Sequence, residues 1–386
     1  MRILVVNAGS SSIKAMVFDE GLSALASVSV AEIGGKATIR AGGAAVPCAA
    51  PDHHAAMAAI LQALAGQGIA PESLTAAAHR IVHGGAALVA PERVTPDLIA
   101  RIEACIPIAP LHNPANLAGI RALQAIVPAL PQYASFDTAF HATIPPVAHR
   151  YALPAAEEAR GLRRYGFHGL SYASLVAHLP MLAEAPLPRR LLAFHLGNGA
   201  SATAILDGRS VASTMGYSPL AGLVMGTRTG DIDGNAVLKM AEDHGIDGAA
   251  RILNRESGLK ALGGQSDMRA LKAAGTAEAA FAIDHFCYWA ARHGASLMAA
   301  MAGLDAIAFT GGIGENDADA RRAIIGHLAF TGAELDPEAN ALGASAIHSA
   351  TSSVAVWIVP AQEERQIAQE ALGLIRKGPG RAEGDA

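Results

Sequence analysis

A polar turn between two apolar segments opens the chain and constrains its fold more than any other feature. The turn covers residues 7–14 (NAGSSSIK), with apolar residues 3–6 before it and 15–18 after it, so a β-strand is predicted on each side. Its glycine, hydroxyls and Lys14 can bring backbone N–H groups and an ammonium close to a phosphate. Walker loops and dinucleotide-binding turns lead into a helix instead, which favours a third nucleotide-binding architecture. An ordinary Ser-rich hairpin loop is the alternative.

The same pattern returns half a chain later. Apolar residues 191–196 lead into the turn 197–202 (GNGASA), and strands are predicted over 203–206 and 209–213. The turn also fits G-x-G-x-x-A, but a strand follows it where a dinucleotide site needs a helix, which disfavours a dehydrogenase. The repeat predicts two related domains, each opened by a hairpin that directs a polar turn into a shared cleft.

Strand and helix signals alternate along the rest of the chain, which predicts an α/β protein. Helices are predicted at residues 53–64, 113–127, 317–328 and 363–376, an apolar helix at 277–303, and strands at 306–310 and 354–359. The apolar helix contains charged residues, which indicates a buried helix of a soluble protein. We expect an N-terminal domain over residues 1–145, a nucleotide-binding domain over 146–363, and a C-terminal helix of about 364–386 that packs back on the first domain.

Composition narrows the functional class. At 386 residues, 51% of them apolar, the chain fits two domains of ordinary size. A net charge of −5 without a basic run gives no indication of nucleic-acid binding. Three widely spaced cysteines argue against a disulfide framework or zinc cluster and favour a reducing compartment. With no signal peptide in view, we expect a cytoplasmic protein with no membrane attachment.

Four polar residues lie where chemistry is expected. Arg80 interrupts an apolar segment, so it should be buried or face a cleft and needs an anionic partner. Asp137 follows a predicted strand, and His168 lies between glycines. Arg228 belongs to the Gly-rich segment 216–234, whose composition suits a mobile active-site loop. Other histidines beside apolar segments are interpreted, from the residues alone, as hydrogen-bonded core groups: His79, His83, His141 and His195.

Together these residues suit phosphoryl transfer, in which the protein positions the transferring group and neutralises its charge. The sequence has no nucleophile paired with an obvious base and no H-E-x-x-H motif. A hydroxyl acceptor would require a base. A carboxylate acceptor is already ionised at pH 7 and would be held by an arginine.

Taken together, the motifs resemble the acetate and propionate kinase family, from Asn7 to Glu363. The resemblance rests on residues 7–12, 79–85, 109–114, 136–141, 165–169, 195–199, 226–231 and 311–316. It implies the two-domain actin-like ATPase fold shared by acetate and sugar kinases, Hsp70 and actin. It also implies a homodimer and the reaction ATP + acetate ⇌ ADP + acetyl phosphate, dependent on Mg²⁺, with Mn²⁺ as the alternative metal. A propionate or other short-chain acid kinase is the alternative.

The resemblance assigns roles to individual residues. Arg80 and Arg228 resemble the pair that binds the carboxylate and steadies the phosphoryl group, and His168 resembles the histidine that donates to that group. Asp137 resembles the acid near the acetyl end, with His112 supporting it. Metal-site residues would be Asn7 and Glu363. Phosphate contacts would be Ser10, Ser12, Lys14, His195, Leu196, Gly197, Asn198 and Gly199. The adenosine pocket would include Asp267, Met268, Arg269, Gly311, Gly312, Ile313, Gly314 and Asn316. The acetyl methyl would contact Val82, Leu111, Phe167 and Pro219.

Two departures from the family pattern affect this assignment. Gln362 precedes the retained Glu363 where the family has Thr-Asn-Glu-Glu, which affects the magnesium geometry. Met268 replaces a phenylalanine, which affects adenine stacking or the choice between ATP and GTP. One methylene in an apolar pocket changes binding by only about 1–3 kcal/mol, so propionate is expected to be a poorer substrate. A nucleotide-binding regulator of the same fold, with little turnover, remains the second hypothesis.

Overall fold

The computed structural model describes residues 1–378, and the chain divides into two compact units. The first unit combines Met1–Ala139 with the C-terminal segment from Gln362, and the second is Phe140–Ala361. The expected domain limits, 145 and 363, lie near these junctions without coinciding with them. The expected C-terminal helix was extended to 386, and residues 379–386 lie outside the described part of the chain.

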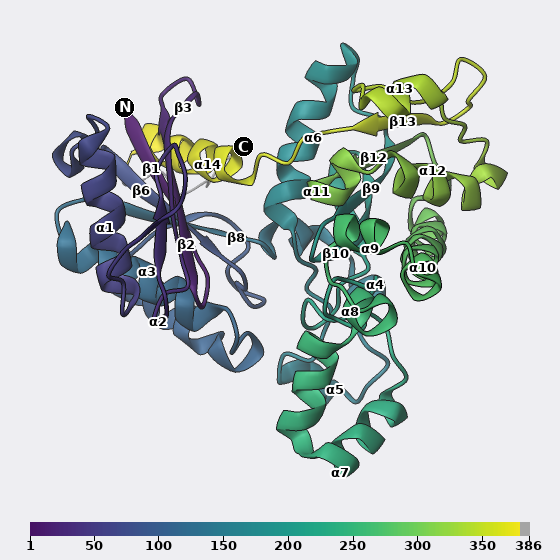
Figure 1. The fold of residues 1–386 in the computed structure, drawn as a ribbon, viewed down its shortest axis with the longest axis horizontal. Helices are drawn as coiled ribbons and strands as arrows, with labels where there is room; N and C mark the ends of the chain where they lie inside the picture. Colours follow the sequence, from purple (N-terminus) through teal and green to yellow (C-terminus); the bar gives the residue numbers. More distant parts are fainter. Residues whose placement is uncertain (379–386) are drawn as a thin grey trace. The chain divides into compact units, whose positions relative to one another are not determined.

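The first unit contains one mixed sheet (Figure 1). The strands of this unit are β1 (Arg2–Ala8), β2 (Ser12–Asp19), β3 (Ala24–Ala31), β4 (Thr38–Arg40), β5 (Val46–Pro47), β6 (Ala76–Ile81), β7 (Glu92–Arg93) and β8 (Gln132–Phe136). Its helices are α1 (His53–Gly66), α2 (Pro96–Ala104), α3 (Asn113–Ile126) and α14 (Glu363–Lys377). The strand order is β5-β4-β3-β2-β1-β6-β8-β7.

The opening hairpin is formed as the sequence predicts. β1 and β2 pair antiparallel, with Asn7 opposite Lys14 and Ala8 opposite Ile13. The turn closes through a hydrogen bond of 2.7 Å from the Gly9 N–H to the Ser12 carbonyl oxygen. The polar turn therefore lies at the end of β1, beside the next parallel strand, β6.

Helices α1 and α3 form a hydrophobic core with this sheet. Leu4 and Val6 of β1 are fully buried together with Ile60 of α1. Gly119 of α3 allows close approach, because a Cβ at that position would lie 2.8 Å from the Cβ of Ala8. The side chain of Asp52 caps α1 by accepting from the Ala55 N–H, as expected from its position before the helix.

The second unit is built on a five-stranded sheet. Its strands are β9 (Arg190–Leu196), β10 (Ala200–Leu206), β11 (Arg209–Ser213), β12 (Ala306–Thr310) and β13 (Ala355–Ile358). Its helices are α4 (Pro146–His149), α5 (Ala155–Ala159), α6 (Gly169–Ala183), α7 (Gly234–Arg251), α8 (Gly258–Gly263), α9 (Met268–Ala274), α10 (Ala277–Met301), α11 (Gly311–Asn316), α12 (Ala318–His327) and α13 (Pro337–Leu342), with one π-helical turn at Ile252–Glu256.

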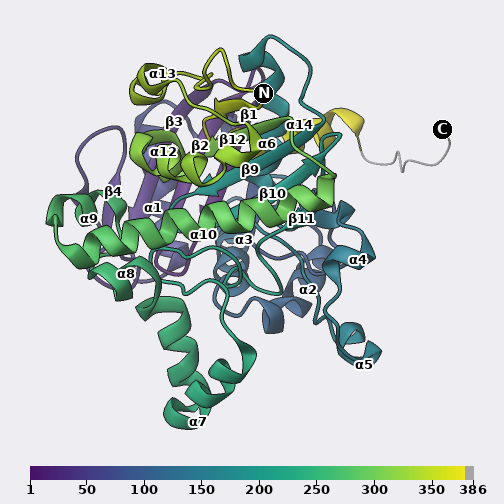
Figure 2. The same ribbon diagram turned by 90° about the vertical axis from the view of Figure 1, so that its right-hand side faces the viewer.

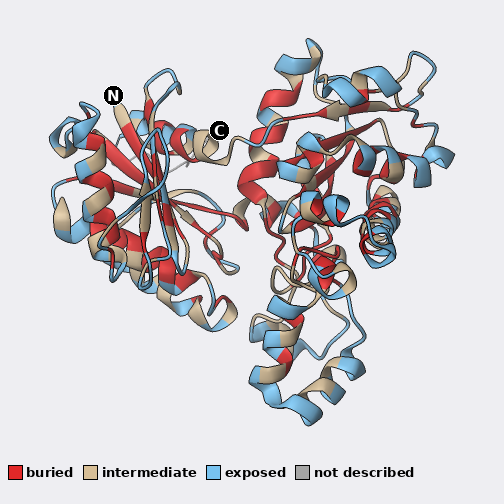
Figure 3. Cartoon of the chain, viewed as in Figure 1, coloured by how far each residue is buried: buried red, intermediate tan, exposed pale blue. Residues whose placement is uncertain are grey.

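The two sheets share a topology, which confirms that the repeat in the sequence is structural. The order β3-β2-β1-β6-β8 of the first sheet corresponds to β11-β10-β9-β12-β13 of the second. In each, three strands pair antiparallel, a fourth pairs parallel to the first strand of the hairpin, and a fifth pairs parallel to the fourth. The central strands of both sheets are largely buried (Figure 3).

Two long helices pack on the second sheet. Leu191 and Ala193 of β9 form a core with α6, whereas Phe194, which points to the other face, contacts Gly294 of α10. Figure 2 shows α10 lying across β9, β10 and β11. No helix within residues 1–378 is both long enough and apolar enough to span a bilayer.

The glycine run after β12 differs from the expected loop. We expected one helix from about residue 317, and α12 does begin there, capped by Asp317. The preceding glycines form a helix of their own, α11. Gly311 begins it with φ +78°, and a Cβ there would lie 2.8 Å from the carbonyl oxygen of Leu196. Glycine therefore suits this start, which helix propensity alone does not predict.

Candidate active site

In the first unit, Arg80 has the anionic partner that its sequence context predicts. Arg80 lies at the end of β6, and Asp137 immediately follows the parallel neighbour β8. The Arg80 guanidinium donates from Nε to Oδ1 at 3.0 Å and from Nη2 to Oδ2 at 2.6 Å. Glu363, the first residue of α14, lies 4.0 Å away. Burial opposes the charged form, but Asp137 and Glu363 prevail and raise the pKa of Arg80 above its ordinary value.

Two buried asparagines of α3 hold the backbone that follows Arg80, and the sequence analysis did not identify them. Asn116 accepts from the Val82 N–H at 3.0 Å and donates to the Ala8 carbonyl oxygen at 2.7 Å. Asn113 donates to the His83 carbonyl oxygen at 2.9 Å and accepts from the His83 N–H at 3.2 Å. Asn116 thus connects the end of β1 to the segment after β6, so α3 fixes both.

In the first polar turn, the residues predicted to bind phosphate or metal are exposed or half-buried. Ser10 and Lys14 are exposed, and Ser12 and Asn7 are half-buried. A further residue, His53 at the start of α1, contacts the turn through Nε2, 2.8 Å from the Gly9 carbonyl oxygen. His112 precedes α3 and is close enough to influence the Asp137 carboxyl electrostatically.

In the second unit, His168 begins α6 in a strained conformation. Its backbone has φ 57° and ψ 24°, a left-handed conformation that a non-glycine residue adopts at a cost. Its Nδ1 lies 2.9 Å from Ser201 Oγ, and its ring stacks on His195 with centroids 4.2 Å apart. The His195 Nδ1 lies in turn 2.8 Å from Ser171 Oγ.

Arg228 approaches His168 above Gly199, in the second polar turn. A Cβ on Gly199 would lie 2.9 Å from Arg228 Nη2 and 3.2 Å from His168 Nε2. Arg228 Nη1 donates to the Pro219 carbonyl oxygen at 2.6 Å, and burial lowers the pKa of this arginine. A guanidinium and an imidazole nitrogen therefore converge on the backbone of a phosphate-type turn, which suits an anionic ligand.

The segment that carries Arg228 is irregular, as expected, but its hydrogen bonds hold it in place. Met225 N–H donates to the Arg228 carbonyl oxygen at 3.2 Å, and Leu259 N–H donates to the Met225 carbonyl oxygen at 2.9 Å. Gly258 (φ +66°) lies so close to Met225 that a Cβ would overlap the Met225 carbonyl oxygen. The π-helical turn and α8 thus support the segment and its glycines allow close packing, while its mobility stays a prediction.

A cavity of about 730 Å³ in the second unit collects most of the predicted adenosine residues. Its lining comprises Gly197, Asn198, Ser266, Asp267, Met268, Arg269, Lys272, Gly312, Ile313, Asn316 and Asp317. The predicted Leu196, Gly199, Gly311, Gly314 and His195 are outside this lining.

Three residues of the cavity were not predicted: Ser266, Lys272 and Asp317. The ammonium of Lys272 pairs with Asp317 and lies 3.0 Å from Asp319. Asp267 caps α9 by accepting from the Arg269 and Ala270 N–H groups, and it also pairs with the Arg269 side chain.

The predicted apolar contacts of the acetyl group are divided between the units. Val82 is half-buried and Leu111 is 49% exposed in the first unit. In the second unit, Phe167 is buried and Pro219 is half-buried. The apolar character of all four fits the predicted role, which stays a prediction.

Two histidines interpreted as core residues are confirmed as such. His79 Nε2 lies 2.7 Å from Gln132 Oε1, and burial lowers its pKa to about 4. His141 lies between Ser210 Oγ at 2.8 Å and the Phe167 carbonyl oxygen at 2.9 Å, and burial lowers its pKa to about 4 as well. His83 is also buried, and its Nδ1 accepts from the Gly85 N–H at 2.9 Å.

The donors proposed for a divalent metal are of a fitting chemical type. Within residues 1–378, no three His, Cys, Asp or Glu side chains form a metal cluster. Magnesium is usually held by only one or two carboxylates together with substrate phosphates and water. Glu363 supplies a carboxylate that is 17% exposed, and Asn7 supplies a half-buried amide at the end of β1. The donor types of these two residues fit such a site, and their role as metal ligands stays a prediction.

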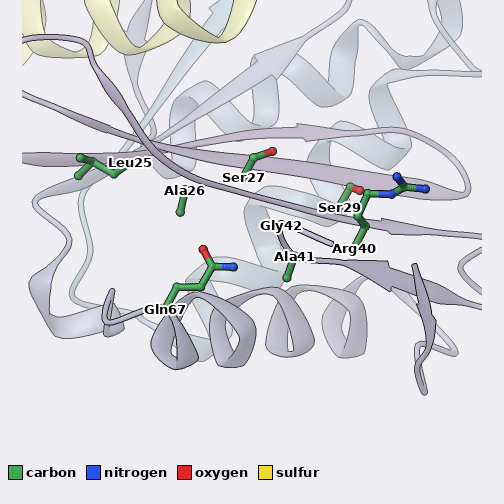
Figure 4. Close-up of a pocket in the computed structure, with 8 residues that line it drawn as sticks. All are labelled: Leu25, Ala26, Ser27, Ser29, Arg40, Ala41, Gly42 and Gln67. Carbon is green, nitrogen blue, oxygen red and sulfur yellow. The ribbon is translucent and has the colours of Figure 1, made fainter. Parts of the chain in front are cut away.

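A second cavity, of about 470 Å³, lies elsewhere in the first unit (Figure 4). It is formed by β3, the segment around Arg40 and the end of α1 at Gln67. None of the predicted site residues lines it, and Arg40 is its one charged side chain. Its chemistry suggests no part in the site.

Comparison with known proteins assigns the family. The profile of the Acetokinase family matches residues 2–369. The chain is 42% identical to an acetate kinase of Leifsonia xyli subsp. xyli, covering 97% of this chain and 99% of the relative. It is 43% identical to an acetate kinase of Nitrobacter hamburgensis, covering 97% and 96%.

Solved structures of an acetate kinase and a propionate kinase support the same family assignment. The crystal structure of Porphyromonas gingivalis acetate kinase matches with a TM-score of 0.90 and 34% identity, covering 97% of this chain and 99% of that chain. A propionate kinase from Francisella tularensis subsp. tularensis SCHU S4 matches with a TM-score of 0.91 and 36% identity, covering 96% and 98%. The two mixed sheets thus form the actin-like ATPase fold, and the chain belongs to the Acetokinase family.

Proposed function

We propose that this protein transfers the γ-phosphoryl group of ATP directly to a carboxylate oxygen of acetate, reversibly. Homology over the full length makes it an acetate kinase, a phosphotransferase with a carboxyl group as acceptor. In the forward reaction a bond forms between the acetate oxygen and the γ-phosphorus. The bond from that phosphorus to the β–γ bridging oxygen breaks, and ADP leaves with the electron pair.

The observation that carries the proposal is the convergence of Arg228 Nη2 and His168 Nε2 above Gly199. Charge on a transferring phosphoryl group is spread over its equatorial oxygens, so catalysis depends on donors placed beforehand. We assign Arg228 and His168 to those oxygens, with backbone N–H groups of the polar turns on the neighbouring phosphates. Adenosine would occupy the 730 Å³ cavity.

Arg80 is proposed to hold the acetate carboxylate. The Asp137 carboxylate accepts hydrogen bonds from Arg80 Nε and Nη2, which fixes the direction of the guanidinium. The acceptor needs no deprotonation, so no general base is required. We assign Asp137 to orienting Arg80, and Val82, Leu111, Phe167 and Pro219 to contacts with the acyl methyl.

A bound Mg²⁺ would neutralise phosphate charge, and Asn7 and Glu363 are the residues proposed to hold it. Glu363 also lies 4.0 Å from Arg80, so the metal side and the acid side of the site share this carboxylate. Mn²⁺ is expected to substitute, since it takes similar oxygen ligands.

Hydroxylamine trapping tests the proposal. Acetyl hydroxamate should form from acetate with Mg-ATP, and propionate should give less product. The ratio should correspond to about 1–3 kcal/mol for the added methylene. A preference for propionate would reassign the acid. Nucleotide binding without hydroxamate from acetate, propionate or butyrate would refute acid phosphorylation and favour a nucleotide-binding regulator.

Two further features are proposed. The three cysteines are unpaired, which fits a reducing, cytoplasmic location. A homodimer is expected from the resemblance to the family, and sedimentation of the purified protein would test it.

A further inference from the structure

One carboxylate in the second unit binds two backbone amides that are far apart in the sequence. Glu315 of α11 accepts at Oε1 from the Gly311 N–H at 3.0 Å and from the Ala361 N–H at 2.9 Å. A backbone N–H can only donate, and a carboxylate oxygen has room for two such bonds, so the direction of both is settled. The description of the active site above gives Glu315 no role.

The helix that carries Glu315 needs support from the rest of the unit. α11 covers only six residues, Gly311–Asn316, and three of them are glycine, one of the poorest helix formers. Isolated helices of this length are not stable in water, so tertiary contacts must hold α11. The first N–H groups of a helix have no partner within it, and Glu315 supplies an acceptor to that of Gly311.

A buried guanidinium holds the opposite end of α11. Arg321 of α12 is 1% exposed, and its Nη1 donates to the carbonyl oxygens of Gly314 and Glu315 at 2.9 and 2.8 Å. Its Nε and Nη2 donate to the side-chain and backbone oxygens of Asn340, each at 2.7 Å. A cation beside the last carbonyl groups of a helix is favourable. The C-terminal end of α11 is thus fixed by Arg321, and its N-terminal end depends on Glu315.

α11 forms part of the cavity that we assign to adenosine. Gly312, Ile313 and Asn316 line this cavity, whereas Glu315 is outside the lining. Glu315 therefore acts on a bound nucleotide through the position of α11 and not by direct contact.

The second donor to Glu315 lies at the junction of the two units. Ala361 is the last residue of the second unit, and the chain enters the first unit at Gln362. Glu363, which lies 4.0 Å from Arg80, is the next residue. Because only Gln362 separates Ala361 from Glu363, the position of Ala361 restricts that of Glu363.

We propose that Glu315 is a positioning residue that couples nucleotide binding to the junction at Ala361. A nucleotide in the cavity restrains α11, and α11 holds Ala361 through the Glu315 carboxylate. Two sites are coupled when both act on one structural element, which here is α11. The inference rests on the proposed adenosine site for its ligand. It rests on phosphoryl transfer only for its purpose, which is to set the nucleotide and Glu363 together.

Hydrogen–deuterium exchange measured by mass spectrometry tests the coupling, in a peptide of residues 359–363. Saturating ADP should slow exchange at the wild-type Ala361 amide about tenfold, as the strengthening of one hydrogen bond does. In Glu315→Ala this amide should exchange rapidly, and equally fast with and without ADP. Exchange that ADP does not slow in the wild type, or that ADP still slows in Glu315→Ala, would overturn the proposal.

Nucleotide affinity supplies the second measurement. Glu315→Ala should raise the Kd of ADP about tenfold, because the N-terminal end of α11 loses its acceptor. Glu315→Gln keeps the side-chain length and an oxygen that can accept both N–H groups, so most of the affinity and of the ADP-dependent slowing should return. This variant also provides a test if Glu315→Ala fails to fold. An unchanged Kd in Glu315→Ala, or no recovery in Glu315→Gln, would contradict the assignment.

Glu334→Ala is the matched control. Glu334 is exposed in the same unit, accepts from Thr351 Oγ1 at 2.7 Å and is outside the cavity lining. This variant should leave the Kd of ADP and the exchange of Ala361 unchanged. The same changes in Glu334→Ala would mean a general loosening of the second unit and would refute a specific role of Glu315.

The two proposals fail in different ways. If the wild type bound ADP but made no acyl phosphate, the proposed function would fail, while the exchange measurement still decided the coupling. If the wild type did not bind ADP, the adenosine assignment and the role of Glu315 would both be refuted.

Discussion

Nη2 of Arg80 lies 2.6 Å from Oδ2 of Asp137, and the two residues come from the ends of adjacent parallel strands. The carboxylate therefore sets the direction of the guanidinium that we assign to acetate. Asp137→Asn should lower kcat/KM for acetate by about 10²–10³, because one amide nitrogen cannot accept a hydrogen bond and the pair loses its charge. It should also destabilise the first unit by about 3 kcal/mol, as breaking a buried ion pair does.

Steady-state kinetics and urea unfolding measure the two effects of Asp137→Asn. Asp97→Asn is the control, since Asp97 is 81% exposed and lies 3.7 Å from Arg101. It should change neither quantity noticeably. Wild-type kcat/KM in Asp137→Asn would remove Asp137 from the account of acetate binding.

Gly199→Ala should impair turnover without unfolding the protein. The added methyl would lie 2.9 Å from Arg228 Nη2 and 3.2 Å from His168 Nε2, so it displaces the two groups that meet the phosphoryl oxygens. We expect kcat to fall by at least about 10², comparable to loss of one transition-state donor. Gly326→Ala on α12, where a Cβ would meet nothing within 4 Å, should keep wild-type kcat. Equal rates in the two variants would contradict the site geometry.

Asn116→Ala should loosen the backbone beside Arg80. The substitution removes the part-buried hydrogen bond to the Val82 N–H and the buried one to the Ala8 carbonyl oxygen. A loss of about 2–3 kcal/mol in unfolding free energy is expected, together with a higher KM for acetate. Asn254→Ala, which removes one exposed contact to the Ala250 carbonyl oxygen, should have little effect. Similar stabilities of both variants would show that Asn116 does not hold these strands together.

Stability should decline in mild acid because of His79 and His141. Burial lowers the pKa of each to about 4 from an unfolded value of 6.5, so the unfolded chain binds more protons between these limits. Their contribution is therefore complete above pH 6.5 and is lost as the pH falls toward 4, up to about 3 kcal/mol for each.

Urea unfolding at pH 7 and pH 5 of His79→Gln tests this dependence. The variant lacks one titrating group, so its stability should fall less between these two pH values than that of the wild type. The same substitution at exposed His54 should leave the wild-type dependence unchanged. A His79→Gln protein with the full wild-type pH dependence would exclude His79 as a source.

The sequence predicted those parts of the fold that depend on local pattern. Both hairpins were recognisable because apolar runs flank a polar turn, and Asp52 and Asp317 cap helices where short polar side chains precede them. The need of Arg80 for an anion was also predictable, since a guanidinium within an apolar strand must be neutralised. Asp137 could be named as a candidate site residue. It could not be identified as the partner of Arg80, because 57 residues separate the two in the sequence.

The supporting residues could not be predicted in the same way. Asn116 and Ser201 are polar residues within apolar segments, and their partners are set by tertiary packing. The segment around Arg228 was interpreted as mobile from its glycines, which stays a prediction, whereas the close packing at Gly226 and Gly258 was not foreseen. Composition does not distinguish flexibility from close approach, because glycine permits both.

The stereochemistry of transfer tests the central claim most directly. ATP made chiral at the γ-phosphorus with oxygen isotopes should be converted with acetate into acetyl phosphate of inverted configuration, because a single in-line displacement inverts phosphorus. Phosphorus-31 NMR of the product reads the configuration. Retention would require an intermediate phosphoenzyme and would contradict direct transfer between Arg80-bound acetate and the phosphoryl group held by Arg228 and His168.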